Sequence, residues 1–203
     1  CRARATHLCG DQHLGVSVQH GVEAFRDGPY AFTVPAIVNT VYGRWWHPLD
    51  ELSGGGDPIK SPLPWVGDYE DGLGNKITML AYANPQDRSI RAGRGDGYGI
   101  VHFNKRKGVI DFECWPRFAD LTKGDSEQYK GWPISFHVSD NDGRIPIGYL
   151  KEVILPMDNA VVELTNDTAD ELVYCYRIKG RKFSAPVYEK GAYTLRAGLN
   201  RAE

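Results

Sequence analysis

The residues best suited to chemistry lie near the start of the chain, in the run Gly10-Asp11-Gln12-His13. This run directly follows residues 3–9, which we expect to form a short strand. A carboxylate and an imidazole two residues apart, on a loop at a strand end, can both point into one site. Iron, manganese, zinc and calcium ions accept such oxygen and nitrogen ligands. Asp11 and His13 are therefore candidate metal ligands, and Gly10 is expected to let the backbone turn tightly beside the metal.

The same spacing also has an ordinary structural interpretation. Residues 14–25 carry apolar side chains at helical spacing, which predicts a helix. Asp11 would then cap the N-terminus of that helix, and His13 would lie in its first turn. Because Asp-x-His often occurs by chance, the spacing alone leaves both interpretations open.

The elements that must position this loop are expected to be mostly strands. The chain has 23 glycines, 12 prolines and only 2 methionines, a composition that favours turns and strands. The clearest pattern is a hairpin, in which residues 98–104 and 109–115 flank a polar turn ending in Gly108. In its second strand, the apolar side chains of Ile110, Phe112 and Cys114 alternate with charged ones, as expected when one face is buried.

The rest of the chain divides into further strands and one long irregular segment. Strands are expected at residues 30–38, 76–83, 161–165, 172–178, 183–188 and 192–197. Residues 42–75 are expected to be irregular, and such a segment usually lines a site or packs across a surface. Within it, Arg44 could hold a phosphoryl oxygen, and Trp45 and Trp46 could wall a substrate cleft. The interpretation favoured for the two tryptophans is that they anchor an irregular loop on the core.

Charge and composition exclude several classes of protein. The 203 residues include 24 Lys and Arg against 26 Asp and Glu, a formal net charge of -2. A dedicated nucleic-acid binder needs a positive excess, so no nucleic-acid partner is expected. No apolar run approaches the roughly 18 residues of a membrane span. The sequence also contains neither Gly-x-Ser-x-Gly nor a phosphate-binding loop, which argues against serine hydrolases and nucleotide-binding proteins of those types.

The cysteines and the remaining histidines are expected to have structural roles. Cys9, Cys114 and Cys175 lie in strand-like runs without the spacing of a zinc or redox site, which favours buried free thiols. Disulfides are the alternative if the chain is exported. His7 is expected to be a core or edge residue of its strand. His20 is expected to be solvated or to lie behind a ligand.

Residues 7–14, His-Leu-Cys-Gly-Asp-Gln-His-Leu, resemble the late metal-binding motif of metallophosphoesterases of the alkaline phosphatase D type. In the wider superfamily this motif is Gly-His-x-His, and in the alkaline phosphatase D branch the first His is commonly replaced by Asp. Other segments resemble later parts of these bacterial proteins, so that the similarity covers nearly the whole chain: residues 32–37, 44–48, 71–76, 81–85, 97–101 and 112–117.

The resemblance implies a fold and an activity. The fold class is α/β and β-rich: residues 1–120 would be the C-terminal portion of a metallophosphoesterase α/β sandwich, residues 121–144 a connection, and residues 145–203 a small β-sandwich accessory domain. The reaction would be metal-assisted hydrolysis of a phosphate mono- or diester. Asp11 would bind one metal ion and His13 the other, with Fe, Ca, Mn or Zn as the ions. The family is typically exported, which implies a periplasmic or secreted protein.

The chain departs from the family in what precedes its motif. Full members build a two-metal site from an Asp-x-His, a Gly-Asp and a Gly-Asn-His/Asp motif that come earlier, whereas only ten residues precede Asp11 here. The chain begins with Cys1 and not Met, and is expected to be the C-terminal part of such an enzyme. Because both ions must clamp the attacking and leaving oxygens, we expect this chain alone to be inactive or nearly so. The other ligands would come from a missing N-terminal part or a companion chain.

A second hypothesis places the chain in a different class. It could be a non-catalytic, β-rich binding or assembly module that has kept the fold. A truncated sheet exposes edges and apolar surface, and would need a partner chain to cover them. The two hypotheses differ in whether the companion chain carries the missing metal motifs.

Overall fold

The computed structural model describes residues 5–37, 61–84 and 95–202, and the chain in these ranges is rich in β-structure. It contains fifteen strands there, and its helical segments in the same ranges are two 3-10 helices. The expectation of a β-rich class is confirmed. The chain divides into two compact units, of which the larger comprises residues 5–143 and the smaller the part that begins at Arg144.

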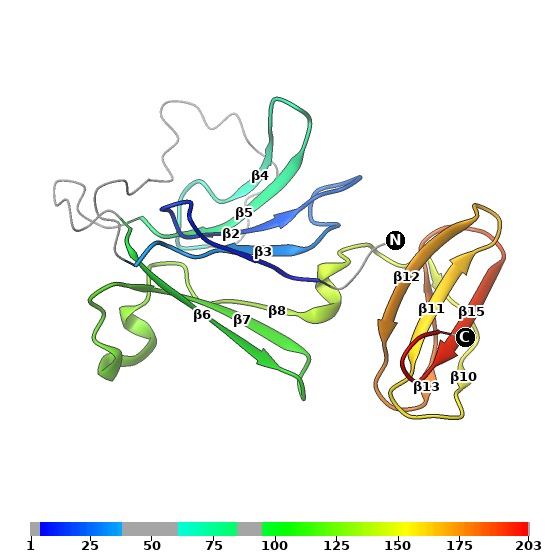
Figure 1. The fold of residues 1–203 in the computed structure, drawn as a ribbon. Coiled ribbons are helices and arrows are strands. Elements are labelled where there is room, and N and C mark those ends of the chain that lie inside the picture. The colour runs from blue at the N-terminus through cyan, green and yellow to red at the C-terminus, as the bar shows by residue number, and fades with distance from the viewer. Residues whose placement is uncertain (1–4, 38–60, 85–94, 203) are drawn as a thin grey trace. The chain divides into compact units, whose positions relative to one another are not determined.

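The larger unit contains a five-stranded sheet with the strand order β1-β3-β2-β5-β4 (Figure 1). Its strands are β1 (His7–Cys9), β2 (Val16–His20), β3 (Tyr30–Thr33), β4 (Gly67–Glu70) and β5 (Lys76–Tyr82). Strand β1 runs parallel to β3, and the other neighbours are antiparallel. Between Ser17 and Val18 the pairing of β2 with β5 shifts register and skips Leu80. This irregularity is a β-bulge, which bends a strand and increases its local twist.

A second sheet in the same unit has the order β6-β7-β8. Its antiparallel strands are β6 (Gly97–Asn104), β7 (Val109–Pro116) and β8 (Ile134–His137), and the 3-10 helices are η2 (Leu121–Glu127) and η3 (Val138–Asn141). The predicted hairpin is confirmed as β6 and β7. Its turn ends in Gly108, whose φ of 69° lies in the left-handed region that glycine adopts at little cost.

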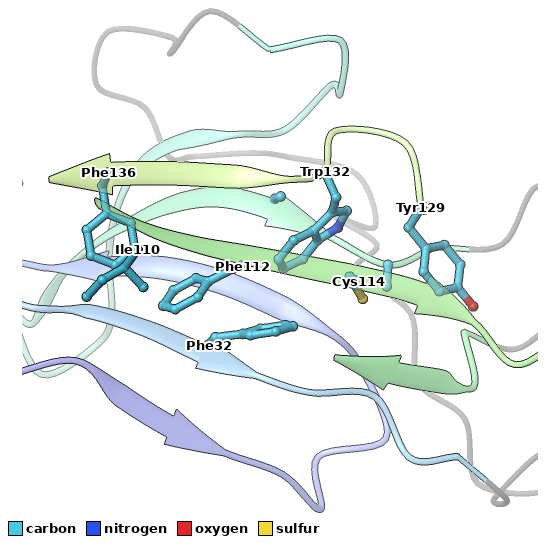
Figure 2. Close-up of a cluster of buried hydrophobic side chains, with 9 residues drawn as sticks. Phe32, Ile110, Phe112, Cys114, Tyr129, Trp132 and Phe136 are labelled. Carbon is cyan, nitrogen blue, oxygen red and sulfur yellow. The ribbon is translucent and has the colours of Figure 1, made fainter. Parts of the chain in front are cut away.

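The two sheets share one hydrophobic core (Figure 2). Phe32 of β3 and Phe112 of β7 are both fully buried, and their stacked rings have centroids 5.1 Å apart. The ring centroid of Trp132 lies 4.9 Å from that of Phe32. Burial of large aromatic side chains dominates core energetics, so these contacts hold the hairpin against the five-stranded sheet. The buried members of the core are Phe32, Ala81, Ala83, Ile110, Phe112, Cys114, Tyr129, Trp132 and Phe136.

The smaller unit is built entirely of short strands in the described residues. Its three-stranded sheet has the order β12-β11-β15, made by β11 (Val161–Asn166), β12 (Glu171–Arg177) and β15 (Tyr193–Gly198). Two strand pairs accompany it: β9 (Gly148–Tyr149) with β14 (Pro186–Val187), and β10 (Val153–Ile154) with β13 (Lys182–Phe183). Tyr174 of β12 is fully buried, and its hydroxyl donates to the carbonyl of Pro186, 3.1 Å away.

The helix expected at residues 14–25 is not formed, because β2 occupies its first part. The residues after β2 make a tight loop that leads back into β3. A Cβ on Gly21 would lie 2.5 Å from the carbonyl oxygen of Ala24, and one on Gly28 would lie 2.7 Å from that of His20. These two glycines let the chain fold back sharply, so the apolar residues at helical spacing belong to a loop and not to a helix.

Of residues 121–144, expected to be a connection, all but Arg144 lie in the larger unit. They provide β8 and three core aromatics: Tyr129, Trp132 and Phe136. Strand β4 likewise lies inside residues 42–75, which we expected to be irregular. In both segments the apolar residues follow no regular alternation with polar ones, so the sequence did not indicate their burial.

Candidate metal-binding loop

Asp11 and His13 both lie in residues 10–15, the loop that joins β1 to β2. Their backbone is left-handed, with φ of 67° at Asp11 and 55° at His13. This region costs a non-glycine residue about 1–2 kcal/mol, although Asp and His adopt it more often than most. Gly10 has no positive φ, and a Cβ there would meet only Val34 at an ordinary 3.5 Å. The expectation that Gly10 makes the turn is wrong, because the two candidate ligands make it.

Both ends of this loop are fixed on the sheet. At its start, the amide of Val34 donates to the carbonyl of Cys9 over 2.8 Å, and at its end the amide of Ala83 donates to the carbonyl of Gly15 over 2.7 Å. A Cβ on Gly15 would lie 3.0 Å from both the Cβ of Ala83 and the sulfur of Cys114. Glycine at position 15 therefore allows the loop to lie this close to the core, and both candidate ligands lie between fixed points of the sheet.

The carboxylate and the imidazole face each other. Asp11 Oδ1 lies 3.8 Å from His13 Nε2, with the Asp11 side chain fully exposed and the His13 side chain 19% exposed. The other ring nitrogen of His13, Nδ1, is buried. The imidazole therefore presents Nε2 to the carboxylate, and an oxygen donor and a nitrogen donor stand close together at the surface. This donor set fits a hard or borderline metal ion.

The interpretation of Asp11 as a helix cap is excluded, because the chain continues into a strand. Asp120 shows what a capping aspartate does in this chain: it caps η2, and its Oδ1 accepts from the amide and the hydroxyl of Thr122. These hydrogen bonds from Thr122 lower the pKa of Asp120. Within the described residues, Asp11 accepts no such backbone hydrogen bond.

Two donors do not complete a metal centre. In residues 5–37, 61–84 and 95–202, no group of three or more His, Cys, Asp or Glu side chains is placed to hold a metal ion. The residues predicted to bind substrate, Arg44, Trp45 and Trp46, lie outside the described residues. The structure thus brings the two candidate ligands together and describes no other residue of the predicted site.

A polar cluster that the sequence did not single out lies in the same unit. Arg26 forms a two-point ion pair with Asp68, with Nε to Oδ1 at 3.1 Å and Nη2 to Oδ2 at 3.0 Å. The hydroxyl of Thr78 also donates to Asp68 Oδ1 over 2.6 Å. Asp68 is buried, and both of its oxygens are used by the protein itself. The cluster therefore stabilises the fold and does not resemble an open ligand site.

The cysteines and histidines differ partly from expectation. Cys9, Cys114 and Cys175 are free thiols, but only Cys114 is buried, and burial raises its pKa well above the ordinary value. Cys9 is exposed, since it lies on β1, all of whose residues are exposed. The structure also brings His7 and His20 together, a pairing that the sequence did not indicate. Only the strand order of the sheet reveals that they are neighbours.

No helix in the described residues has the length and apolar character needed to cross a membrane. Comparison of the chain with protein-family models, with curated proteins and with solved structures gives no match.

Proposed function

We propose that the chain is the C-terminal portion of an alkaline phosphatase D-like metallophosphoesterase, with Asp11 and His13 as metal ligands. The observation that carries this proposal is the geometry of residues 10–15. Both proposed ligands hold left-handed backbone, and the exposed carboxylate of Asp11 faces Nε2 of His13 over 3.8 Å. Strained backbone persists where the surrounding structure requires it, and such residues cluster at functional sites.

The roles of the chain's own residues follow from their donors. Asp11 offers carboxylate oxygens, and His13 offers Nε2, while its Nδ1 is buried. Fe, Mn, Zn or Ca ions bound there would neutralise phosphate oxygens and activate the attacking water. Arg44 would hold a phosphoryl oxygen, as its guanidinium suits two-point recognition of phosphate. The α/β sandwich, the small β-sandwich and the periplasmic or secreted location belong to the same proposal.

The exposed edge of the five-stranded sheet supports the proposal that a further chain segment packs beside strand β1. Among the described strands, β1 pairs only with β3, and it does so in parallel. An edge strand presents unpaired backbone groups with which another chain can pair, and all three residues of β1 are exposed, with Leu8 49% exposed. The N-terminal part or a companion chain would cover this edge and supply the other metal ligands. The 203-residue chain alone is then inactive or nearly so.

The same edge favours a second candidate function, a non-catalytic binding or assembly module. In that case a partner chain covers β1, and the loop at residues 10–15 binds no metal. The two functions therefore predict the same partner-binding edge and differ in the use of Asp11 and His13.

The test measures metal content and hydrolysis in one fraction of the protein purified from its source with everything bound to it. The substrates are p-nitrophenyl phosphate and bis-p-nitrophenyl phosphate. We expect about two metal ions per active complex. Asp11→Asn and His13→Asn should each lower turnover at least about 100-fold, because even groups that only support metal ligands cost 10–100-fold.

The matched control is Asp170→Asn. Asp170 also has left-handed backbone, with φ of 52°, but it lies in the turn between β11 and β12 of the smaller unit. Turnover and metal content should remain at the wild-type level in this variant. If Asp11→Asn also behaves like wild type, the metal-ligand proposal fails. A companion protein without metal or turnover would favour the binding module.

A further inference from the structure

One face of the five-stranded sheet carries two histidines side by side. His7 lies opposite Ala31 across the β1–β3 pair, and Ala31 lies opposite Val18 across the β2–β3 pair. His20 follows Val18 by two residues on β2, so it points to the same face. The small side chain of Ala31 stands in the strand between them. The two rings approach over it, with centroids 5.8 Å apart and planes inclined at 47°.

Neither imidazole has another use in the described structure. His7 is exposed and His20 is half-buried, and neither ring has a hydrogen-bond or ion-pair partner among the described residues. A strand histidine of the second sheet does have such a partner: His102 Nε2 lies 3.0 Å from Glu113 Oε1. His7 and His20 therefore offer two nitrogen donors to solvent on one face.

We propose that His7 and His20 together bind one divalent transition-metal ion such as Zn²⁺, Ni²⁺ or Cu²⁺. An imidazole nitrogen binds Zn²⁺ at about 2.0–2.1 Å, so two rings that share an ion have centres about 5–6 Å apart. The observed 5.8 Å lies in this range. Imidazole suits Zn, Cu and Ni, whereas Ca and Mg prefer oxygen. Water completes the coordination, since His7 is open to solvent.

Burial, and next the neighbouring His7, lower the pKa of His20. Cys9 is not counted as a ligand, because its sulfur lies 3.0 Å from the hydroxyl of Thr33 on β3.

This site would join the edge strand β1 to β2 and does not depend on the phosphoesterase proposal. An ion that binds the folded chain and not the unfolded one stabilises the fold by mass action. At a hundredfold excess over the dissociation constant, the melting temperature should rise by about 5–10 °C.

The experiment titrates the intact chain with Ni²⁺ and Zn²⁺ by calorimetry, and records the melting temperature at each metal concentration. We expect His7→Gln and His20→Gln each to weaken binding at least tenfold and to abolish the shift in melting temperature. His102→Gln is the matched control, because it removes an exposed strand histidine from the second sheet. Binding should be unchanged in that variant and in Cys9→Ser.

A second comparison separates this site from the loop at residues 10–15. The double variant Asp11→Asn/His13→Asn should keep the His7–His20 affinity. The proposal is overturned if His7→Gln binds like wild type, or if only the double variant loses binding. His7 is exposed, so its substitution leaves the fold intact and the test remains decisive even if His20→Gln fails to fold.

Discussion

Residues 10–15 and residues 21–29 are two loops of the same sheet, and each places an aspartate beside a non-glycine residue with left-handed backbone. In residues 21–29 the strained residue is Arg26, with φ of 66°, and its neighbour Asp27 is 8% exposed. In residues 10–15 the strain falls on Asp11 itself and on His13, and the carboxylate is fully exposed.

The two loops differ in how their charges are satisfied. The carboxylate of Asp27 accepts from three consecutive backbone amides at 2.6–3.1 Å, those of Val22, Glu23 and Ala24. Arg26 in turn pairs with Asp68. Folding itself therefore compensates the strain of residues 21–29. In residues 10–15 the described structure gives Asp11 only His13 as a neighbour, so a bound ligand would provide the compensation that folding does not.

The largest expected effect is that of Asp27→Ala. Three amides in a partly buried loop lose a charged acceptor, and we expect a loss of about 3 kcal/mol in the free energy of unfolding. Urea denaturation of the intact chain measures it. Asp11→Ala is the counterpart in the other loop and should stay within about 0.5 kcal/mol of wild type. Equal losses in the free energy of unfolding of the two variants would show that the two loops do not differ in how they satisfy their aspartate.

Relief of backbone strain should produce a smaller effect of opposite sign. Asp11→Gly removes a left-handed strain of about 1–2 kcal/mol and costs about 0.5–1 kcal/mol in additional chain entropy, for a net gain of up to about 1.5 kcal/mol in the free energy of unfolding. Asp170→Gly, at a similar φ, should gain as much. If Asp11 is a metal ligand as proposed, only Asp11→Gly should reduce the metal content of the protein purified with everything bound to it. Thermal denaturation and metal analysis of both variants check this, and a stabilising Asp11→Gly that keeps its metal would contradict the ligand role.

The smallest effect concerns His20, which borders residues 21–29. Its pKa in the folded chain is lowered by burial and then by His7, whereas in the unfolded chain the group titrates near 6.5. The unfolded state therefore binds the proton more readily, so stability is full above pH 6.5 and falls as the pH drops through the folded-state pKa. Urea denaturation at pH 5 and pH 7.5 should show a smaller pH-dependent loss in His20→Gln. An identical loss in both proteins would show that His20 titrates normally.

Strands with one apolar and one polar face could be predicted from the sequence, whereas strands with both faces covered could not. The β6–β7 hairpin was predictable because Ile110 and Phe112 alternate with charged residues that remain at the surface. Strand β2 was misread because its buried positions are polar: Ser17 is fully buried and Gln19 is 5% exposed, while Val16 and Val18 pack on the other face. Such a strand carries no simple hydrophobic signal, since both of its faces are covered.

The candidate site was predictable in position but not in conformation. The run at residues 10–13 correctly placed Asp11 and His13 in a loop after a strand. Their left-handed backbone could not be read from the sequence, because glycine at position 10 was the obvious turn residue. The His7–His20 pair was also hidden, since the two residues become neighbours only when β3 inserts between β1 and β2.

The bulge at Leu80 interrupts the regular alternation of side chains along strand β5. Thr78 opposes Gln19 and Ala81 opposes Ser17, and both are fully buried on the same face although they are three residues apart. Leu80 is the residue that the bulge absorbs: if it were paired regularly, inside and outside would be exchanged for one half of the strand. The bulge therefore lets β5 contain one extra residue while Ala83 still meets Gly15, where the loop of residues 10–15 ends.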